Sequence, residues 1–235
     1  MDRAAALDTI GFDADDTLWH NETVFKLTED RFAALLADYA DKKHLETRLL
    51  AAERRNVTHY GYGIKGFMLS MIETALEVTD RKVPASVISE ILEAGKEMLS
   101  HPVEPLPHVR ETLEAVAGDY RLVLITKGDL FDQERKIAAS GLADYFNAIE
   151  VVSEKSADTY QTLFSRHGSG AENALMIGNS LKSDILPALE AGSIGVHVPY
   201  QLTWGLEHAE EPASHDRFHR IDHIGKLLQL LERLG

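Results

Sequence analysis

The segment IGFDADDTLW, residues 10–19, decides the fold, because an apolar run ends there in three acids within four positions. Carboxylates that follow a buried strand directly are costly unless they are paired or bind a metal. Alternation along a strand predicts Asp13 and Asp15 on one side and Asp16 on the other. Two adjacent acids at the carboxyl end of a first strand favour a Mg²⁺ site, whereas a solvated Asp-rich turn is the alternative.

The composition indicates a soluble globular protein. The chain has 235 residues, which suits one or two domains, and its 44% apolar and 26% charged residues are ordinary. Cysteine is absent, which excludes disulfides, thiol chemistry and a thiolate zinc site. The first residues do not resemble a secretory signal, and no apolar run approaches the about 20 residues of a membrane span. We therefore expect a cytoplasmic protein with no membrane partner.

The net charge is strongly negative, −14, from 24 basic and 38 acidic residues. Such a surface repels nucleic acid, whose binding depends on lysine and arginine at the phosphates, so no nucleic-acid partner is expected. A small phosphorylated ligand would need positive charge concentrated locally, from a metal ion and a few lysines.

The first hundred residues combine one short strand with a helical region. Residues 5–13 are predicted to form a buried strand. Apolar residues then recur at helical spacing within residues 25–39, 45–50, 67–76 and 87–99, which predicts four helices. The proline-rich segment HPVEPLP, residues 101–107, predicts a stiff connector at a domain boundary.

The remainder alternates between helix and strand. Helices are expected at 109–117, 130–140, 157–167, 185–191 and 224–234, and strands at 120–126, 148–152, 174–177 and 194–198. This alternation predicts an α/β fold with an open parallel, Rossmann-like sheet flanked by helices. We expect an α/β core at residues 1–18 and 102–235, and a helical domain at residues 19–101.

Polar residues with matching chemistry follow four of the predicted strands. The carboxyl ends of parallel strands meet at one edge of the sheet, where ligands bind. This edge would carry carboxylates, a hydroxyl, lysines and an amide, contributed by Asp13, Asp15, Thr126, Lys127, Glu154, Lys155, Asn179 and Asp184. Such a set binds a phosphate oxyanion and a divalent cation together.

Four segments in this order resemble the motifs of the haloacid dehalogenase-like superfamily. They are DADDT at 13–17, LITKG at 124–128, EK at 154–155 and GNSLKSD at 178–184. The resemblance covers the whole chain, because residues 20–100 fall where that superfamily inserts a helical cap. It implies a Mg²⁺-dependent phosphatase that hydrolyses a small phosphorylated metabolite. We expect a monomer or a homodimer, and the sequence leaves the choice between them open.

The resemblance also implies the roles of the catalytic and phosphate-binding residues. Asp13 would attack phosphorus and form an aspartyl-phosphate. Asp15 would protonate the leaving oxygen and then deprotonate the attacking water. Thr126 and the backbone around Lys127 would hold phosphoryl oxygens, and Lys155 would neutralise both the phosphate and Asp13.

The implied metal ligands are the Asp13 carboxylate, the Asp15 backbone carbonyl and the fourth motif, with Asn179 and Asp184. Many members have Asp at the position of Asn179, and an amide offers an oxygen without charge. We therefore expect weaker Mg²⁺ binding or a larger part for Asp184. No chemical role is expected for Asp16, which occupies a variable place in the motif.

Three other activities remain open at this stage. Dehalogenase members lack an acid at the position of Asp15, so its presence favours phosphoryl transfer over 2-haloacid dehalogenation. A phosphomutase is compatible with the same residues. A catalytically weakened binding or regulatory module is the third, and Asn179 is the feature that favours it.

The segment THYGYGIKGF, residues 58–67, is the candidate for contact with the rest of the substrate. Its glycines and tyrosines predict a shaped loop that approaches a ligand closely, the alternative being a plain connection between helices. His59, Tyr60 and Lys65 are the candidate contacts.

Overall fold

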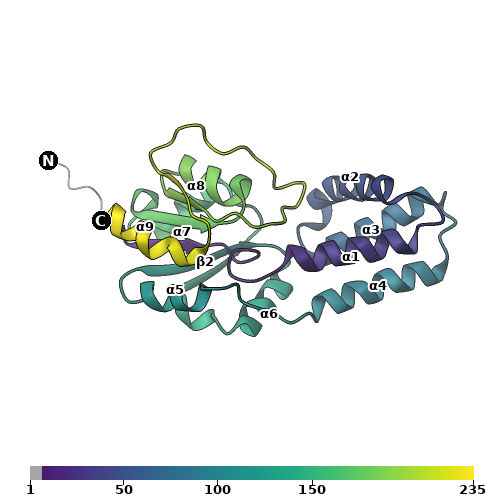
Figure 1. Cartoon of the computed structure of the whole chain (residues 1–235), viewed down its shortest axis with the longest axis horizontal. Helices are drawn as coiled ribbons and strands as arrows, with labels where there is room; N and C mark the ends of the chain where they lie inside the picture. The colour runs from purple at the N-terminus through teal and green to yellow at the C-terminus, as the bar shows by residue number, and fades with distance from the viewer. Residues whose placement is uncertain (1–6) are drawn as a thin grey trace. The chain divides into compact units, whose positions relative to one another are not determined.

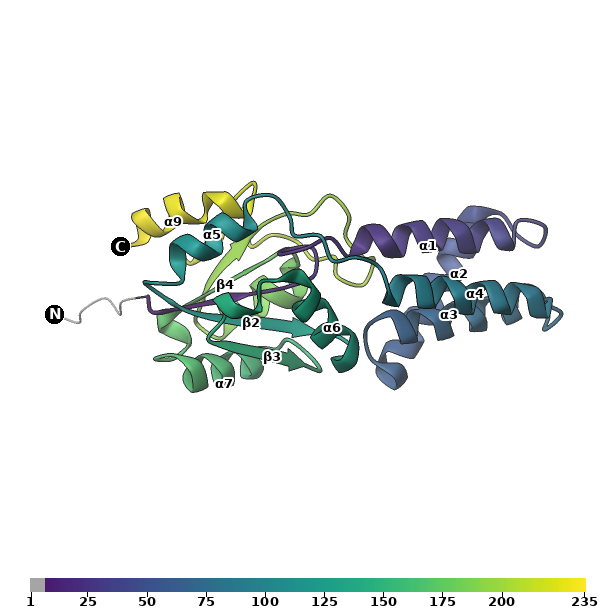
Figure 2. The same ribbon diagram turned by 90° about the horizontal axis from the view of Figure 1, so that it is seen from below.

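The computed structural model describes residues 7–235, in which six strands form one parallel sheet (Figures 1 and 2). The order is β3-β2-β1-β4-β5-β6. The bounds are β1 Thr9–Phe12, β2 Arg121–Lys127, β3 Ala148–Val152, β4 Ala174–Gly178, β5 Ile194–His197 and β6 Phe218–Arg220. The predicted α/β class with an open parallel sheet is confirmed.

The central strands are buried apolar runs, as expected for a parallel sheet that helices cover on both faces. Every residue of β1 and β4 is buried. In the register of the sheet, Phe12 of β1 lies opposite Leu124 of β2 and Ile177 of β4. In this register β4 ends one residue beyond β1 and β2 ends three residues beyond it. The residues that follow these parallel strands therefore gather at one edge of the sheet.

Helices pack on both faces of this sheet. Helices α5 (Val109–Val116) and α9 (Leu227–Leu234) share one hydrophobic cluster with Phe12 and Leu124. Helices α7 (Ala157–His167) and α8 (Leu186–Glu190) contribute to a second cluster. That second cluster contains Val123 and Met176, whose side chains leave the sheet on the opposite face. Helix α6 (Leu130–Ser140) adds Ile137 to the first cluster.

Four helices form a separate compact unit with its own core (Figure 1). They are α1 (Glu22–Leu35), α2 (Lys42–Tyr60), α3 (Ile64–Val78) and α4 (Ala85–Leu99). The buried side chains that hold them together are apolar and include Phe32, Leu45, Phe67, Met71 and Ile91. None of the helices within residues 7–235 combines the length and the apolar character that crossing a membrane requires.

The chain divides into two units by its own contacts. Among the described residues, the α/β unit comprises 7–20, 103–127 and 133–235, and the helical unit comprises 21–102 and 128–132. Segment 128–132 had been expected within the α/β core. It groups instead with the helical unit, where the Lys65 ammonium lies 2.9 and 3.0 Å from the carboxylate oxygens of Asp129.

The two ends of the helical insert run side by side within the α/β unit. The Leu106 N–H donates to the Leu18 carbonyl at 2.9 Å, and the His20 N–H donates to the Glu104 carbonyl at 3.3 Å. Trp19 also forms an antiparallel bridge with Pro105 and is fully buried. The chain therefore leaves the core and returns to it at one place.

Three local expectations were wrong. The strand predicted at 5–13, whose first two residues lie outside the described ones, ends at Phe12. The acids after it therefore lie in a turn, where strand alternation does not apply, and Asp16 has a φ of 62°. The loop predicted at 58–67 is confined to 61–63, with positive φ at Gly61 and Gly63.

The helix predicted at 185–191 begins earlier in the structure than the sequence indicates. A π-helical turn at Leu181–Ile185 precedes α8, so helical structure begins four residues earlier. The Ser180 side chain accepts from the Ser183 N–H at 3.0 Å and caps this turn. A cap of this kind satisfies one of the N–H groups that a helix start leaves without a partner.

Candidate active site

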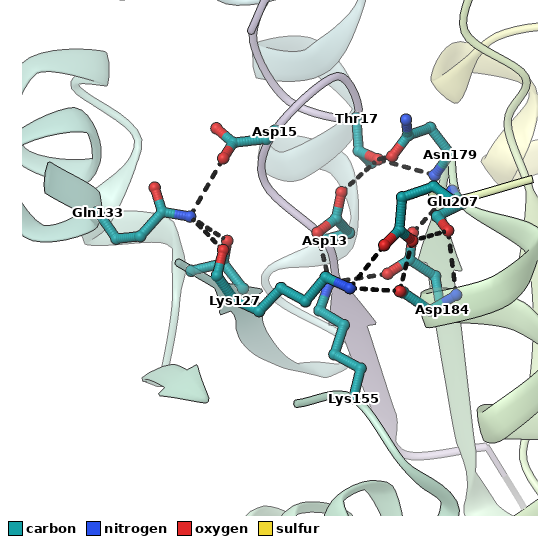
Figure 3. A network of polar contacts seen from close by, with 12 residues as sticks. Asp13, Asp15, Thr17, Lys127, Gln133, Lys155, Asn179, Asp184 and Glu207 are labelled. Atoms are coloured by element: carbon teal, nitrogen blue, oxygen red, sulfur yellow. Dashed lines mark hydrogen bonds and ion pairs between the residues drawn. The ribbon is translucent and has the colours of Figure 1, made fainter. Parts of the chain in front are cut away.

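The acids of the first and fourth motifs meet at one buried lysine (Figure 3). The Lys155 ammonium lies 2.5 Å from Asp13 Oδ1 and 2.7 Å from Asp184 Oδ1. All three side chains are buried. Lys155 follows β3, Asp13 follows β1 and Asp184 follows β4. The structure therefore brings these predicted site residues together at the carboxyl edge of the sheet.

The charges in this trio do not balance. Two carboxylates share one ammonium, which leaves an excess of negative charge in a buried place. Burial, and then the charge of Asp184, raises the pKa of Asp13 to about 7, although Lys155 opposes the shift. Burial lowers the pKa of Lys155, but Asp13 and Asp184 outweigh it and hold that pKa well above its ordinary value. A further cation would therefore be attracted to the trio.

Thr17 ties the nucleophile candidate to the fourth motif and was not singled out from the sequence. Its hydroxyl donates to Asp13 Oδ2 at 2.9 Å and accepts from the Asn179 N–H at 3.0 Å. The Asn179 side-chain oxygen lies 3.3 Å from the same hydroxyl. Thr17 is buried, four positions after Asp13, which is the turn spacing that could have indicated it.

Gly178 leaves the space that Asp184 occupies. A Cβ at Gly178 would lie 2.2 Å from Asp184 Oδ2, a distance that no side chain tolerates. The same carboxylate oxygen accepts from the Ser180 N–H at 2.9 Å. The glycine at the end of β4 is therefore required for Asp184 to reach Lys155.

The Asp15 carboxylate is held on a different side, by donors from its own turn and from α6. Trp19 Nε1 donates to Oδ1 at 2.7 Å, and Lys136 Nζ lies 2.6 Å from both oxygens. Gln133 Nε2 donates to Oδ2 at 3.1 Å. Sequence reasoning missed Gln133 and Lys136. Their three-residue spacing on a helix that follows Thr126 by a few positions was the available signal.

Gln133 also joins Asp15 to the second motif (Figure 3). Its Nε2 lies 2.6 Å from the Thr126 hydroxyl and 3.0 Å from the Lys127 carbonyl. Thr126 is buried at the end of β2. The amide therefore fixes the strand end at which a phosphoryl group is expected to bind.

The side chain of Lys127 turns towards a residue that the sequence did not indicate. Lys127 Nζ lies 2.7 Å from both Glu207 Oε1 and Ser183 Oγ. Glu207 belongs to the long loop after β5, and it also accepts from Ser180 Oγ at 2.6 Å and Ser183 Oγ at 2.5 Å. Glu207 therefore ties this loop to the second and fourth motifs.

The environment of Glu207 favours its ionised form. Burial acts to raise the pKa of Glu207, but the charge and hydrogen bond of Lys127 and the bonds from two serines outweigh it. The pKa is thus lowered from 4.5. Its ionised form therefore stabilises the fold above that value, and the gain is lost as pH falls through the lowered pKa.

We expect Glu207→Gln to lower the free energy of unfolding at neutral pH by about 1–3 kcal/mol, because it removes the carboxylate that lies 2.7 Å from the Lys127 ammonium, nearer than that of Glu154 at 3.6 Å. The deficit should shrink as the pH falls below 4.5 and through the lowered pKa of Glu207, where the wild-type side chain also loses its charge. Urea unfolding of both proteins across this range measures it. A deficit that stays constant with pH would contradict the electrostatic explanation.

The oxygens near Lys155 could also hold a metal ion. Asp13, Asp184 and Asn179 provide carboxylate and amide oxygens, which are the ligands that Mg²⁺ prefers. Within residues 7–235 no cluster of three or more His, Cys, Asp or Glu side chains is arranged to hold a metal without help from other donors. A metal here would rely on the Asn179 amide or backbone carbonyls, as the sequence suggests.

The three candidate contacts in the helical unit differ in their surroundings. Tyr60 is 54% exposed at the end of α2, and its ring lies 6.4 Å from that of His59. Lys65, in the first turn of α3, is engaged with Asp129, and its ammonium lies 5.8 Å from the Phe131 ring centre. Phe131 itself is 70% exposed. The helical unit thus presents aromatic and charged groups beside the short 61–63 loop.

A sequence model of haloacid dehalogenase-like hydrolases matches residues 7–192. The chain belongs to this family. A solved structure of a haloacid dehalogenase-like family hydrolase from Xanthomonas campestris agrees with this assignment. It is 43% identical, covers 100% of this chain and 95% of its own, and has a TM-score of 0.86. A 2-haloacid dehalogenase from Pseudomonas syringae, at 19% identity and a TM-score of 0.61, shares the fold with this hydrolase.

Two curated relatives of the hydrolase are named as a phosphatase and as a nucleotidase. A glyceraldehyde 3-phosphate phosphatase from Methanothermobacter thermautotrophicus is 30% identical over 136 residues, 55% of this chain and 59% of the relative. A pyrimidine 5′-nucleotidase from Escherichia coli is 28% identical over 134 residues, 54% of this chain and 56% of the relative. The hydrolase thus matches these relatives over little more than half of their length.

Proposed function

We propose that this hydrolase is a Mg²⁺-dependent phosphatase that cleaves a small phosphorylated metabolite through an aspartyl-phosphate. The observation that carries the proposal is the buried Asp13–Lys155–Asp184 trio, with the carboxylate of Asp15 near enough for its charge to act on Asp13. The trio offers a nucleophile beside a fixed positive charge, and Asp15 offers a separate acid. The names of two relatives, a glyceraldehyde 3-phosphate phosphatase and a pyrimidine 5′-nucleotidase, support the same proposal.

The first step would transfer the phosphoryl group to the protein. A carboxylate oxygen of Asp13 forms a bond to phosphorus, the bond from phosphorus to the ester oxygen breaks, and Asp15 gives that oxygen a proton. Lys155 balances the charge of the phosphoryl group, and the Thr126 hydroxyl holds one of its oxygens. The alcohol then leaves.

The second step would return the protein to its starting state. A water molecule forms a bond to phosphorus and gives a proton to Asp15, and the bond from phosphorus to the Asp13 oxygen breaks. Inorganic phosphate leaves, Asp13 is again a carboxylate, and Asp15 is again an acid. One water is consumed for each ester cleaved, and the protons balance.

The donor set fits Mg²⁺. The ion would be held by oxygens of Asp13, Asp184 and the Asn179 amide, which are the ligands that it prefers. The two carboxylates together carry more negative charge than the Lys155 ammonium neutralises. When bound, the ion would neutralise charge on the phosphoryl oxygens. Because Asn179 is uncharged, the affinity for Mg²⁺ is expected to depend strongly on Asp184.

The helical unit would act as the cap, which selects the alcohol part of the substrate. His59, Tyr60 and Lys65 remain the candidate contacts for that selection. Lys65 would have to exchange its partner Asp129 for a substrate group, or position Asp129 towards one.

Release of inorganic phosphate from p-nitrophenyl phosphate and from a panel of sugar phosphates and nucleotides tests the proposal. Turnover is expected with Mg²⁺ and not after chelation by EDTA. Halide release from a 2-haloacid would indicate a dehalogenase instead, and interconversion of sugar phosphate isomers without phosphate release would indicate a mutase. Inert protein across all three assays would favour a binding module.

A further inference from the structure

Three donors converge on the Asp15 carboxylate from two elements that are distant in the sequence. Lys136 Nζ lies 2.6 Å from both oxygens, Trp19 Nε1 donates to one, and Gln133 Nε2 donates to the other. The Trp19 donor comes from the turn after β1, whereas Lys136 and Gln133 come from α6. The four motifs that identify the family include neither of the α6 residues.

The three donors are buried, which makes their arrangement specific. Trp19 is 0%, Gln133 2% and Lys136 8% exposed. A lysine at this level of burial is rare unless it has a charged partner, and Asp15 supplies one. Their contacts place donors on both oxygens of the carboxylate, so Asp15 cannot rotate or move away without breaking several of them.

The orientation of an acid–base group has a large effect on rate. Proton transfer in the transition state contributes about 10²–10⁴-fold when the group lies within hydrogen-bond reach of the reacting oxygen. A displacement of about 1 Å can remove about 10²-fold of rate. The residues that fix the Asp15 carboxylate therefore determine how much proton transfer by Asp15 contributes to the reaction rate.

We propose that Lys136 is a positioning residue for the reaction, which acts by holding the Asp15 carboxylate at the ester oxygen. The inference rests on the proposed phosphatase function. Gln133 assists from the same helix face and couples Asp15 to Thr126 through one amide. Helix α6 is thus a support that sets the distance between the acid and the phosphate-binding end of β2.

The leaving group separates this role from a purely structural one. An alkoxide leaves poorly and needs its proton during bond cleavage, whereas p-nitrophenolate leaves without one. A loss that acts through Asp15 must therefore be larger for an alkyl phosphate than for p-nitrophenyl phosphate. A general disturbance of the site lowers the activity on the alkyl ester and on the aryl ester by the same factor.

The experiment measures phosphate release from an alkyl phosphate and from p-nitrophenyl phosphate in the presence of Mg²⁺. The proteins compared are wild type, Lys136→Met, Lys136→Arg and the control Lys96→Met. The value of kcat/KM is used because it includes every step up to departure of the alcohol and none after it. For Lys136→Met we expect a loss of about 10²-fold or more on the alkyl ester and about 10-fold or less on the aryl ester. Lys136→Arg should recover a large part of the alkyl activity, since it restores the cation. Lys96 is exposed on α4, and its replacement should change neither value.

Equal losses on the two esters, or none, would overturn the inference while leaving the phosphatase function intact. Failure of Lys136→Arg to recover any alkyl activity would also count against it. If Lys136→Met does not fold, Lys136→Gln is judged by the same comparison. A wild type that releases phosphate from neither ester would instead refute the proposed function, so the two failures are distinguishable.

Discussion

Asp13→Asn is expected to abolish phosphate release, with kcat reduced by at least about 10⁴-fold. The amide keeps the size of the side chain and an oxygen that Lys155 can still contact, but it cannot form the bond to phosphorus. Release of phosphate from the best ester of the panel, measured with Mg²⁺, tests this. Asp16→Asn is the matched control, because Asp16 lies in the same turn and has no proposed chemical role.

The control should retain activity within about threefold of wild type, because asparagine tolerates the positive φ of position 16. Stability gives a second criterion. Burial and Asp184 raise the pKa of Asp13, so its ionised form costs stability at neutral pH, and the cost grows as pH rises towards about 7. Asp13→Asn should therefore unfold at the same or a higher temperature than wild type. An inactive variant that unfolds much earlier would instead indicate loss of the fold.

Lys155→Met is expected to have the largest effect on stability. It leaves Asp13 and Asp184 buried without the ammonium that they share. Removal of one partner from a buried ion pair costs about 3–5 kcal/mol, and two carboxylates depend on this one. Activity should be lost as well, since the charge beside Asp13, the proposed nucleophile, disappears. Urea unfolding at neutral pH measures the deficit.

The pH dependence of that deficit provides the check. Without Lys155, the two carboxylates repel each other, and protonation of one relieves the repulsion, so the deficit should decrease as the pH is lowered. Lys96→Met on the exposed surface of α4 should stay within about 0.5 kcal/mol of wild type. A Lys155→Met protein that loses less than about 1 kcal/mol would show that the trio does not depend on its ammonium.

Sequence alone predicts the scaffold because apolar runs and turn residues determine it locally. β2 is buried and apolar from Leu122 to Ile125, β4 is buried along its whole length without a polar side chain, and the motifs lie at the ends of these runs. Once parallel strands are inferred, the meeting of Asp13, Lys155 and Asp184 at one edge follows from topology. Only their order along the chain is needed for this step.

The supporting residues escape such reasoning for a physical reason. Glu207 lies in a long loop whose path no periodicity fixes, and in the sequence it resembles any solvated acid. Lys136 and Gln133 lie on a helix on which charged residues are common, so their burial becomes evident only from the packing of α6. Asp15, the partner that both residues share, is more than a hundred positions away in the chain.

The paired ends of the helical insert have a consequence for how such a protein can diverge. Because the backbone bonds between Leu18 and Leu106 and between His20 and Glu104 close the core at the insertion point, the sheet keeps its register whatever the chain does between them. Mutations, lengthening or replacement of that insert need not disturb the strand ends that hold the reacting groups. On the proposed function, evolution can therefore exchange one selectivity for another while the chemistry is inherited unchanged.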